Sequence, residues 1–361
     1  MISTAILQST LENILEITGT TAGLFDANGK EVASNDGLKG IDTEAVRAFI
    51  ERGTDKTKDG RFIYSLFTDE ADIRYAVVAD SNSKNADMTV KLLLHELKLL
   101  SDAYKEKLDK DNFVKNLILD NLLQIDIYNR ARKLHIDFNV KRAVFIIESQ
   151  GKEAIVNGIL DEYARKYPKD LYTTVDENNV VLVHELTQEE DAQGELKTYS
   201  EALKADLEDA GVMGRVSYGA VIDEIKEVSK SYKEAKLSLD VGKIFYEEKQ
   251  IVAYNNLGIG RLIYQLPLNL CRMFIKEIFD DKTPDQFDKE TLTTIAKFFE
   301  NNLNVSETSR QLFIHRNTLV YRLDKIQKNT GLDLRAFDDA ITFKIALMVV
   351  KYMEYMKKID Y

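Results

Sequence analysis

The hydrophobic pattern of the 361-residue chain changes twice along its length. The first part has short apolar runs between turn residues, the middle part alternates strand-like and helix-like segments, and the part after Gly258 has helical periodicity alone. Strand-rich and purely helical segments bury their apolar faces in different ways, so a change of pattern marks a change of domain. The sequence therefore predicts an α+β multidomain protein with an all-α C-terminal part.

These changes of pattern divide the chain into four expected segments. They are a small-molecule sensor domain over residues 1–85, signalling and linker helices over 86–135, a middle domain over 136–257 and a helical bundle over 258–361. At about 150 residues per domain, the chain is long enough for two or three separate cores.

The sensor segment combines helices with two expected hairpins. Apolar residues recur at helical spacing over residues 2–17, and the Asn28-Gly29 pair, which tolerates the positive φ of a tight turn, separates the strand-like runs TAGLFD and KEVASN. A short helix, IDTEAVRAFIERG, precedes the strand-like runs RFIYSLFT and RYAVVADS. This order predicts a small α/β domain of the PAS or GAF type, by analogy of fold alone.

A helix expected over residues 86–108 carries Leu93, Leu97, Leu100 and Tyr104 at alternating spacings of four and three. This spacing is typical of a two-helix seam, in which the helix pairs with its twin in a dimer. It is equally typical of a helix that packs on its own domain. The sequence leaves both interpretations open.

The middle segment alternates regularly between strands and helices. Its expected elements are a buried strand, RAVFIIES, a helix, KEAIVNGILDEYARKY, a hairpin, DLYTTVDENNVVLVHEL, a helix, LKTYSEALKADLEDAG, and a strand, GRVSYGAV. The order βαββαβ predicts a ferredoxin-like plan, and a further helix and strand are expected over residues 225–257.

Charge and cysteine content restrict where the chain works. The net charge is −11, and an acidic chain repels nucleic acid unless its basic groups are concentrated locally. No apolar run reaches the roughly 20 residues that span a membrane, and residues 1–19 lack the basic start of a signal peptide. The lone Cys271 is expected to be a buried, inert thiol. We therefore expect a cytoplasmic protein without membrane contact.

A local reversal of charge lies in the helical bundle. Between residues 306 and 330, five basic residues stand against two acidic ones, a local charge of +3. Ser306 is expected to cap a short helix, and after a tight turn a longer helix is expected from about Arg316 to Gly331. This spacing predicts a helix-turn-helix.

The longer helix has one apolar and one polar face. Leu319, Leu323 and Ile326 share the apolar face, which is expected to pack against the first helix. The polar face and the N-terminal flank carry groups that read base edges or neutralise phosphate, namely Arg316, Asn317, Thr318, Tyr321, Lys325 and Lys328. A helical hairpin in a bundle shows a similar pattern, and the outward Asp324 opposes a phosphate backbone. The first two turns are therefore the expected groove contact.

The motif LFIHRNTLVYRLDKIQKNTGLDLRAFDDAITFKIAL resembles the C-terminal helix-turn-helix of the bacterial carbohydrate-diacid regulators and the wider group of purine-catabolism-type regulators. Upstream, GRVSYGAV and VSKSYKEAKLSLDVGK are similar to segments of that family's degenerate GGDEF-like domain. FVKNLIL and RAVFII stand where the family has its linker helix and its preceding strand. The resemblance covers residues 113–352, about two thirds of the chain.

The resemblance implies a transcription regulator that binds double-stranded DNA as a homodimer, since one short helix reads too few base pairs for useful specificity. It implies that the DNA-reading segment contains or adjoins His315, Arg316, Asn317, Thr318, Tyr321 and Arg322.

The middle domain departs from an active GGDEF cyclase. Such an enzyme holds magnesium with carboxylates and needs a glycine-rich hairpin through which the backbone approaches the nucleotide. Here the first strand ends in Glu148-Ser149-Gln150, and the hairpin VDENNV at residues 175–180 has no glycine pair. We therefore expect a structural or dimerising spacer with no catalytic residues.

No metal site or cofactor is expected either. His95, His135 and His184 lie far apart with no Cys or His at ligand spacing, and His315 stands where a helix cap is needed. The sequence also contains no phosphate-binding P-loop and no nucleophile elbow. The chain is thus not expected to be an enzyme.

The start of the sensor, LFDANGKEVASND, is similar to the beginning of the family's diacid-recognition domain, whereas KGIDTEA at residues 39–45 departs from the family pattern. A dicarboxylate effector needs cationic and amide donors. The candidates are Ser34, Asn35, Lys39, Arg47, Arg61 and Arg74. For each residue alone, a solvated surface position is the simpler interpretation.

These observations favour a ligand-responsive DNA-binding transcription regulator, with carbohydrate diacids or related small acids as the expected effector class. The alternative is a divergent nucleotide-binding or cyclase-like signalling protein. A dimerisation protein that has lost DNA binding is a third interpretation, which the local charge of +3 opposes.

Overall fold

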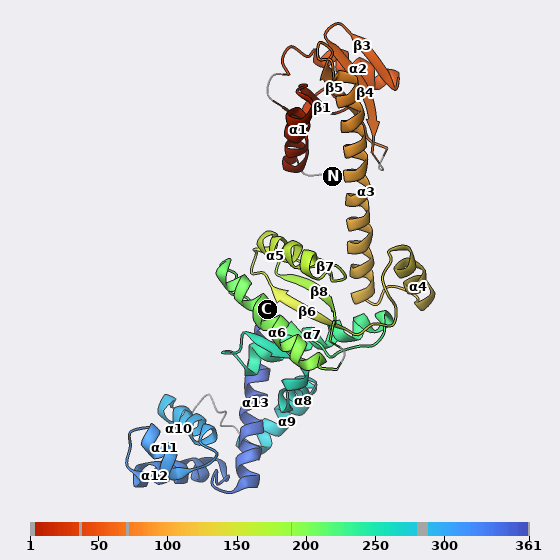
Figure 1. Cartoon of the computed structure of the whole chain (residues 1–361). Helices are drawn as coiled ribbons and strands as arrows, with labels where there is room; N and C mark the ends of the chain where they lie inside the picture. Colours follow the sequence, from red (N-terminus) through yellow and green to blue (C-terminus); the bar gives the residue numbers. More distant parts are fainter. Residues whose placement is uncertain (1–3, 36–37, 70–71, 189, 280–287, 360–361) are drawn as a thin grey trace. The chain divides into compact units, whose positions relative to one another are not determined.

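The computed structural model describes residues 4–35, 38–69, 72–188, 190–279 and 288–359. The chain divides into two compact units, Met1–Phe113 and Val114–Tyr361. Each unit has its own apolar cores and a five-stranded sheet (Figure 1). The α+β multidomain class predicted from the sequence is confirmed.

The first unit is an antiparallel sheet with helices on both faces. Its strands lie in the order β2-β1-β5-β4-β3. Alternate residues of the central strand β5 point to opposite faces, so Val77 packs with α1 and α3 while Ala76 and Val78 pack with α2. The elements are α1 (Thr4–Thr18), β1 (Ala22–Phe25), β2 (Glu31–Ser34), α2 (Thr43–Arg52), β3 (Lys56–Asp59), β4 (Phe62–Thr68), β5 (Arg74–Asp80) and α3 (Ala86–Ile118).

The first hairpin forms where the sequence predicted it. Asp26 Oδ1 accepts hydrogen bonds from the backbone N–H groups of Asn28 and Lys30 at 2.9 and 2.8 Å. Gly29 has a φ of +76°, and a Cβ there would come within 2.4 Å of the Thr43 carbonyl oxygen. Only glycine therefore fits this turn without strain. Asp36, which ends the motif LFDANGKEVASND, lies outside the described residues.

The strand β3 was missed by the sequence analysis. It consists of Lys56–Asp59, a charged and mostly exposed segment that pairs with β4 at the edge of the sheet. An edge strand with little to bury lacks the apolar alternation by which strands are recognised.

The helix α3 packs on its own domain along the predicted seam. Leu93 and Leu97 are only 2% and 3% exposed and belong to the core formed with α1 and the sheet. Leu93 and Leu97 are therefore core residues of the first unit and are not available to a two-helix seam, whereas Tyr104, the last residue of the pattern, is 36% exposed and lies outside this core. The helix also runs past the expected end at Leu108, because no glycine or proline interrupts the sequence before Ile118.

The second unit begins with the middle sheet. Its strands lie in the order β10-β9-β6-β8-β7, and all neighbours are antiparallel except β10 and β9. The elements follow the order expected from the sequence: α4 (Gln124–Lys133), β6 (Arg142–Glu148), α5 (Glu153–Lys166), β7 (Leu171–Asp176), β8 (Asn179–Glu185), α6 (Ala192–Asp209), β9 (Val216–Tyr218), α7 (Val228–Phe245) and β10 (Ile251–Ala253). The linking segment also folds as expected, since α4 forms within it.

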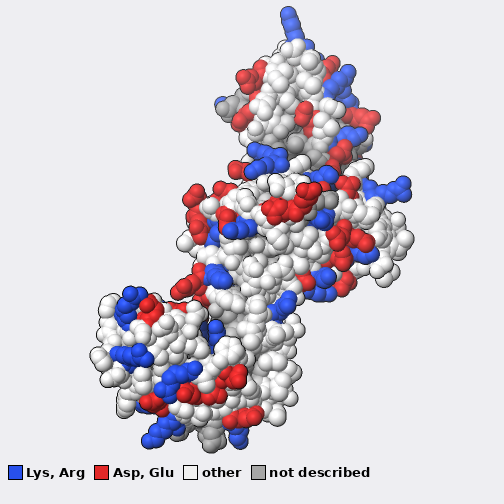
Figure 2. Space-filling view, turned by 60° about the horizontal axis from the view of Figure 1, so that its bottom comes forward, with Lys and Arg blue, Asp and Glu red and all other residues white. Residues whose placement is uncertain are grey.

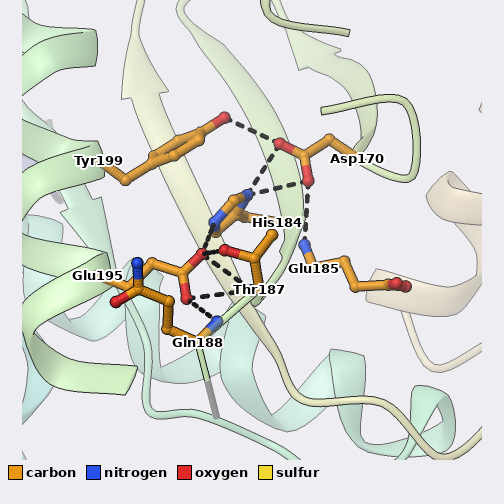
Figure 3. A network of polar contacts seen from close by, with 7 residues as sticks. All are labelled: Asp170, His184, Glu185, Thr187, Gln188, Glu195 and Tyr199. Atoms are coloured by element: carbon orange, nitrogen blue, oxygen red, sulfur yellow. Dashed lines mark hydrogen bonds and ion pairs between the residues drawn. The ribbon is translucent and has the colours of Figure 1, made fainter. Parts of the chain in front are cut away.

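A buried polar network holds β8 to the start of β7 and to α6 (Figure 3). The ring of His184 is fully buried, and its Nδ1 lies 2.9 Å from both oxygens of Asp170. Asp170 also accepts hydrogen bonds from the Tyr199 hydroxyl at 2.9 Å and from the Glu185 backbone N–H at 3.0 Å. Burial first, and then the Asp170 charge, raise the pKa of Tyr199. His184 is thus a core residue whose partners come from adjacent elements.

The other side of the same histidine faces Glu195. Its Nε2 lies 3.5 Å from Glu195 Oε1, and the carboxylate accepts hydrogen bonds from Thr187 and from the Gln188 backbone N–H. Burial alone would raise the pKa of Glu195, but these hydrogen bonds outweigh it and lower the pKa. The network fixes the loop between β8 and α6.

The C-terminal part of the second unit is helical. It comprises α8 (Ile259–Tyr264), α9 (Leu268–Phe279), α10 (Lys289–Glu300), α11 (Val305–Gln311), α12 (Arg316–Thr330) and α13 (Phe337–Ile359). The single helix expected over residues 262–279 is wrong, because the chain breaks around Pro267, whose ring cannot continue a helix. Cys271 is buried, as expected, and burial raises the pKa of its thiol.

Within the described ranges, none of the helices is both long and apolar enough to cross a membrane. The same part of the chain brings no three His, Cys, Asp or Glu side chains together as metal ligands.

Candidate nucleic-acid interface

Two helices of the bundle, α11 and α12, form the helix-turn-helix. The first is capped by Asn304, whose side chain accepts a hydrogen bond from the Glu307 backbone N–H at 3.1 Å. The expected cap at Ser306 is wrong, because the backbone is extended at Asn304 and Ser306 already lies inside the helix. Asn is as good a cap as Ser, so the sequence alone left the start of the helix ambiguous by two residues.

The turn between the helices is held by backbone hydrogen bonds. The Ile314 N–H donates to the Ser309 carbonyl at 3.0 Å, and the Phe313 N–H donates to the Arg310 carbonyl at 3.1 Å. Phe313 has a φ of +54°, at a position where helices usually end in glycine. Its side chain is 96% exposed. The turn is therefore tight, and it presents an aromatic ring to solvent.

The second helix begins at a histidine cap. His315 Nδ1 accepts a hydrogen bond from the Asn317 backbone N–H at 3.2 Å. The helix ends at Gly331, which has a φ of +78°, as predicted. His315, one of the expected DNA-reading residues, thus sets where this helix starts.

The apolar face of α12 is anchored in the core of the bundle. Leu319, Leu323 and Ile326 are all fully buried and pack in one cluster with Phe298 and Phe343. The predicted orientation of the helix is confirmed. Because these residues fix about two turns of the helix, the opposite face has a defined direction.

Most of the predicted DNA-binding side chains lie on that outward face. The exposed members are His315, Arg316, Asn317, Thr318, Tyr321, Lys325 and Lys328. Arg316 reaches back to α11, where its Nη1 donates to Ser306 Oγ at 3.3 Å. The first turn of α12 therefore exposes a guanidinium, a carboxamide and a hydroxyl to solvent.

Arg322 does not lie on the outward face. Its side chain is only 20% exposed and forms an ion pair with Glu290, and its Nη1 donates to Thr294 Oγ1 at 3.0 Å. Lys325 also approaches α10, with its Nζ 3.9 Å from Asp288 Oδ2. Glu290 and Thr294 stand four residues apart and so share one face of α10, but this spacing does not show in the sequence that Arg322 of α12 meets that face.

The acidic residue on the outward face is paired. Asp324 Oδ1 lies 2.8 Å from Nη1 of Arg335, which also contacts Asp333. Hydrogen bonding from Arg335 lowers the pKa of Asp333. Sequence reasoning missed Arg335, although it lies in the LDLRAF part of the family motif. The pair reduces the repulsion that Asp324 would exert on a phosphate.

The surface charge of the bundle is mixed. Figure 2 shows Lys and Arg beside Asp and Glu on the face of the C-terminal helices that it presents. The face that Figure 2 presents is therefore not a broad basic surface, and the local charge of +3 belongs to the sequence segment 306–330 that contains α12.

The six candidate ligand-binding residues of the first unit do not form one site. Asn35 is buried, and its side chain stabilises the fold of the first unit. Its Oδ1 accepts a hydrogen bond from the Ala22 N–H at 2.8 Å, and its Nδ2 donates one to the Leu11 carbonyl at 3.1 Å. Arg47 pairs with Glu51 at 3.0 Å and Arg61 pairs with Asp80 at 2.6 Å, both in exposed positions.

Of the other three candidates, Ser34 donates to Glu31 Oε1 at 2.6 Å, and Lys39 and Arg74 are exposed. None of the six lines the large cavity that the described residues of the first unit form between the sheet, α1 and α3. Sequence reasoning missed this cavity because its wall is assembled from separate elements.

In the middle domain, internal contacts hold the two segments that the sequence analysis compared with a GGDEF cyclase, the end of the first strand and the hairpin. Glu148 Oε1 lies 2.7 Å from Lys243 Nζ, and Glu148 Oε2 accepts from the Arg215 backbone N–H at 3.2 Å. In the hairpin, Asp176 Oδ1 accepts from the Asn178 backbone N–H at 2.8 Å. These carboxylates therefore stabilise the strand ends.

Two protein-family models match the chain. The PucR C-terminal helix-turn-helix domain matches residues 291–349, and the GGDEF-like domain matches residues 120–241. The first match contains α11 and α12, and with them most of the contacts described for the helix-turn-helix.

Several curated proteins are similar to the chain. The carbohydrate diacid regulator of Escherichia coli (strain K12) is 28% identical over 275 residues, which cover 73% of this chain and 71% of that protein. The purine catabolism regulatory protein of Bacillus subtilis (strain 168) is 26% identical over 37% of this chain and 25% of its own length. The DNA-binding transcriptional activator AdeR of the same organism is 29% identical over 48% of this chain and 42% of its own length.

Proposed function

Because the chain belongs to the family of carbohydrate-diacid and purine-catabolism-type bacterial transcription regulators, we propose that it is a ligand-responsive regulator that binds double-stranded DNA through α12. The observation that carries the proposal is the first turn of α12. There, Arg316, Asn317 and Thr318 are exposed on a helix whose opposite face is fully buried.

Each exposed group suits a particular contact with DNA. Asn317 can form two hydrogen bonds with adenine, Arg316 can form two with guanine, and Thr318 can meet a base edge or a thymine methyl group. Lys325, Lys328 and the Tyr321 hydroxyl are placed further along the helix, where they suit the phosphate backbone. Arg322 acts as a positioning residue, because its guanidinium is engaged with α10.

A homodimer gives this helix enough specificity. A single α12 can reach only a few base pairs, whereas two copies read two half-sites about one helical turn apart. The operator is then a two-fold symmetric or near-symmetric sequence.

The remaining parts are assigned by their place in the chain. We assign residues 1–85 to a PAS/GAF-like sensor, 86–135 to signalling and linker helices, 136–257 to a catalytically inactive GGDEF-like spacer, and 258–361 to the DNA-binding bundle. The strand order β9-β6-β8-β7 supports a ferredoxin-like plan for the spacer.

A dicarboxylate is one candidate effector, and transcriptional activation is the proposed outcome of its binding. The name of the Escherichia coli relative supports the first and the name of AdeR supports the second.

Gel shifts on the protein's own promoter, repeated over a salt series, test the proposal. Arg316→Ala and Asn317→Ala are each expected to weaken sequence-specific binding by about 1–3 kcal/mol, with little change on random DNA. Lys328→Ala is expected to weaken binding to the promoter and to random DNA alike. It should also reduce the slope of log affinity against log salt concentration by about 1. Arg272→Ala, on the exposed side of α9, removes the same charge outside the helix-turn-helix and serves as the matched control. Equal affinity of wild type, Arg316→Ala and Asn317→Ala would refute the assignment.

A cyclase-like activity is the alternative, and the GGDEF-like match favours testing it. Incubation of the full chain with magnesium and labelled nucleoside triphosphates distinguishes the two functions. We expect no cyclic product, because Glu148 is held by Lys243 and Arg215. A cyclic product would make the protein an enzyme.

A further inference from the structure

The first unit contains a cavity of about 640 Å³ that none of the six candidate ligand-binding residues lines. This volume suits a small organic molecule. Its apolar floor includes Leu24 of β1, Phe67 of β4 and Leu97 of α3, and α1 closes one side through Leu7. All of these residues belong to a single compact unit, so the cavity depends on no contact with the rest of the chain.

The cavity leaves apolar side chains exposed. Ile73, Tyr104 and Leu108 are large hydrophobic residues that remain 36–44% exposed, and all three line it. A domain in water gains free energy when such side chains are covered. An occupant with an apolar body would cover them.

The rim of the cavity is acidic. Among the described residues that line it, Asp26, Asp69 and Asp109 stand against one cation, Lys105. Burial raises the pKa of the Tyr75 hydroxyl in the wall, and the charges of Asp69 and Asp26 raise it further. Burial is the larger cause of this shift, and the smaller part that Asp69 and Asp26 add reflects their negative charge near the hydroxyl. A dicarboxylate would be repelled here, whereas a cation would be attracted, and the tyrosine rings of the wall can also contact a cation favourably.

We propose that this cavity is the effector site, and that it binds a small organic amine with an apolar or aromatic body. The inference rests on the proposed function, because it identifies the ligand class of the sensor. It differs from the dicarboxylate candidate in the sign of the ligand's charge.

The cavity is lined in part by the helix that connects the first unit to the second. Leu97, Tyr104, Leu108 and Asp109 all belong to α3, which continues without interruption to Ile118. The second compact unit begins at Val114, within the same helix. A ligand that favours one position of α3 therefore acts directly on the element that enters the second unit.

Site-specific labelling of the full chain tests occupancy. Leu108→Cys places a thiol at the cavity, and Leu99→Cys places one on an exposed part of α3 that does not line it. The native Cys271 is buried, so we expect it to react slowly. With saturating phenylethylamine or tryptamine, we expect maleimide labelling to slow at least fivefold in the Leu108→Cys chain and to stay unchanged in the Leu99→Cys chain.

Matched acids and charge variants test the ligand class. Phenylethylamine and tryptamine are expected to raise the Tm of the full chain, whereas 3-phenylpropionate, indole-3-propionate and glucarate are not. Asp26→Asn keeps the hydrogen-bond acceptor that the turn needs. Asp26→Asn or Asp109→Asn is expected to weaken the binding of the amine at least fivefold. Glu96→Gln removes a charge from α3 outside the cavity and should leave amine binding unchanged.

Three outcomes overturn the inference. They are no binding by either amine, equal binding by amines and matched acids, or labelling of the Leu108→Cys chain that slows with protein concentration and not with amine. The last outcome would assign the cavity to a second copy of the chain. In each case, intact promoter binding by the full chain would leave the proposed function standing.

Discussion

At the scale of single residues, the helix-turn-helix separates side chains that can read DNA from those that hold the fold. Arg316 and Arg322 both belong to α12 and have the same chemistry, yet Arg316 is exposed and Arg322 is engaged with α10. Only the packing partner distinguishes them. The residue Phe313 is a different case, since its backbone is strained and its side chain is almost fully exposed.

Replacing Phe313 tests the strain in the turn. An L residue with positive φ costs about 1 kcal/mol relative to glycine, and the exposed ring contributes little packing. Phe313→Gly should therefore unfold at higher denaturant concentration than Phe313→Ala, with a difference of about 1 kcal/mol in the transition of the bundle. Equal stability of the two variants would show that the turn is not strained.

Replacing Arg322 tests its role as a positioning residue. Arg322→Ala removes the ion pair with Glu290 and the hydrogen bond to Thr294, and should destabilise the bundle by about 1 kcal/mol. Thermal unfolding measures this change, and Arg316→Ala, which loses only an exposed contact, is the control. Below the unfolding transition, Arg322→Ala should still bind the promoter specifically. Loss of specific binding at unchanged stability would instead make Arg322 a DNA contact.

At the scale of elements, the long helix α3 has two roles along its length. Its first half packs in the core of the first unit, and its later turns line the cavity and lead into the second unit. The four-and-three spacing of its leucines reflects only the packing of the helix in the core of the first unit. A helix that packs on a sheet needs an apolar stripe of the same width as a helix that packs on its twin.

The Leu97→Asp substitution distinguishes packing of the leucine stripe within the first unit from packing of the stripe on a second copy of α3. The substitution buries a carboxylate beside α1 and the sheet, so we expect the first unit to lose about 3 kcal/mol or more of stability. Leu99→Asp, on the exposed side of the same helix, should have little effect. Circular dichroism during denaturation gives the stability, and sedimentation gives the oligomeric state. A Leu97→Asp chain that keeps its stability but changes from dimer to monomer would restore the two-helix seam.

At the scale of the whole molecule, the two proposed activities lie in different compact units. The cavity belongs to Met1–Phe113, whereas α11 and α12 belong to Val114–Tyr361. A ligand can alter DNA binding only if it has different affinities for two arrangements of the chain. The covalent connection between the units is α3, which spans the boundary.

A truncated chain that begins at Asp111 tests this division. It retains Phe113 and the whole second unit, so we expect it to bind the promoter with the affinity of the full chain. It lacks the cavity, so no effector should change that affinity. Gel shifts with and without the effector measure both properties. If the effector still changes DNA binding by the truncated chain, its site lies in the second unit.

The sequence by itself determined the features that depend on neighbours along the chain. These include the α+β class, the order of elements in the middle domain, the start and stop of α12, and the burial of its apolar stripe. Turn residues, caps and hydrophobic spacing act over a few residues, so they can be recognised locally.

Only the tertiary structure decided which groups meet across elements. It placed Arg322 against α10, paired Asp324 with Arg335, buried Asn35 in the first unit, and surrounded His184 with Asp170 and Glu195. It also assembled one cavity from two helices and a sheet. Such contacts join residues far apart in the sequence, and most of the residue types involved are more often found at exposed positions. Local patterns therefore predict the elements, whereas the burial and pairing of charged groups depend on how those elements pack.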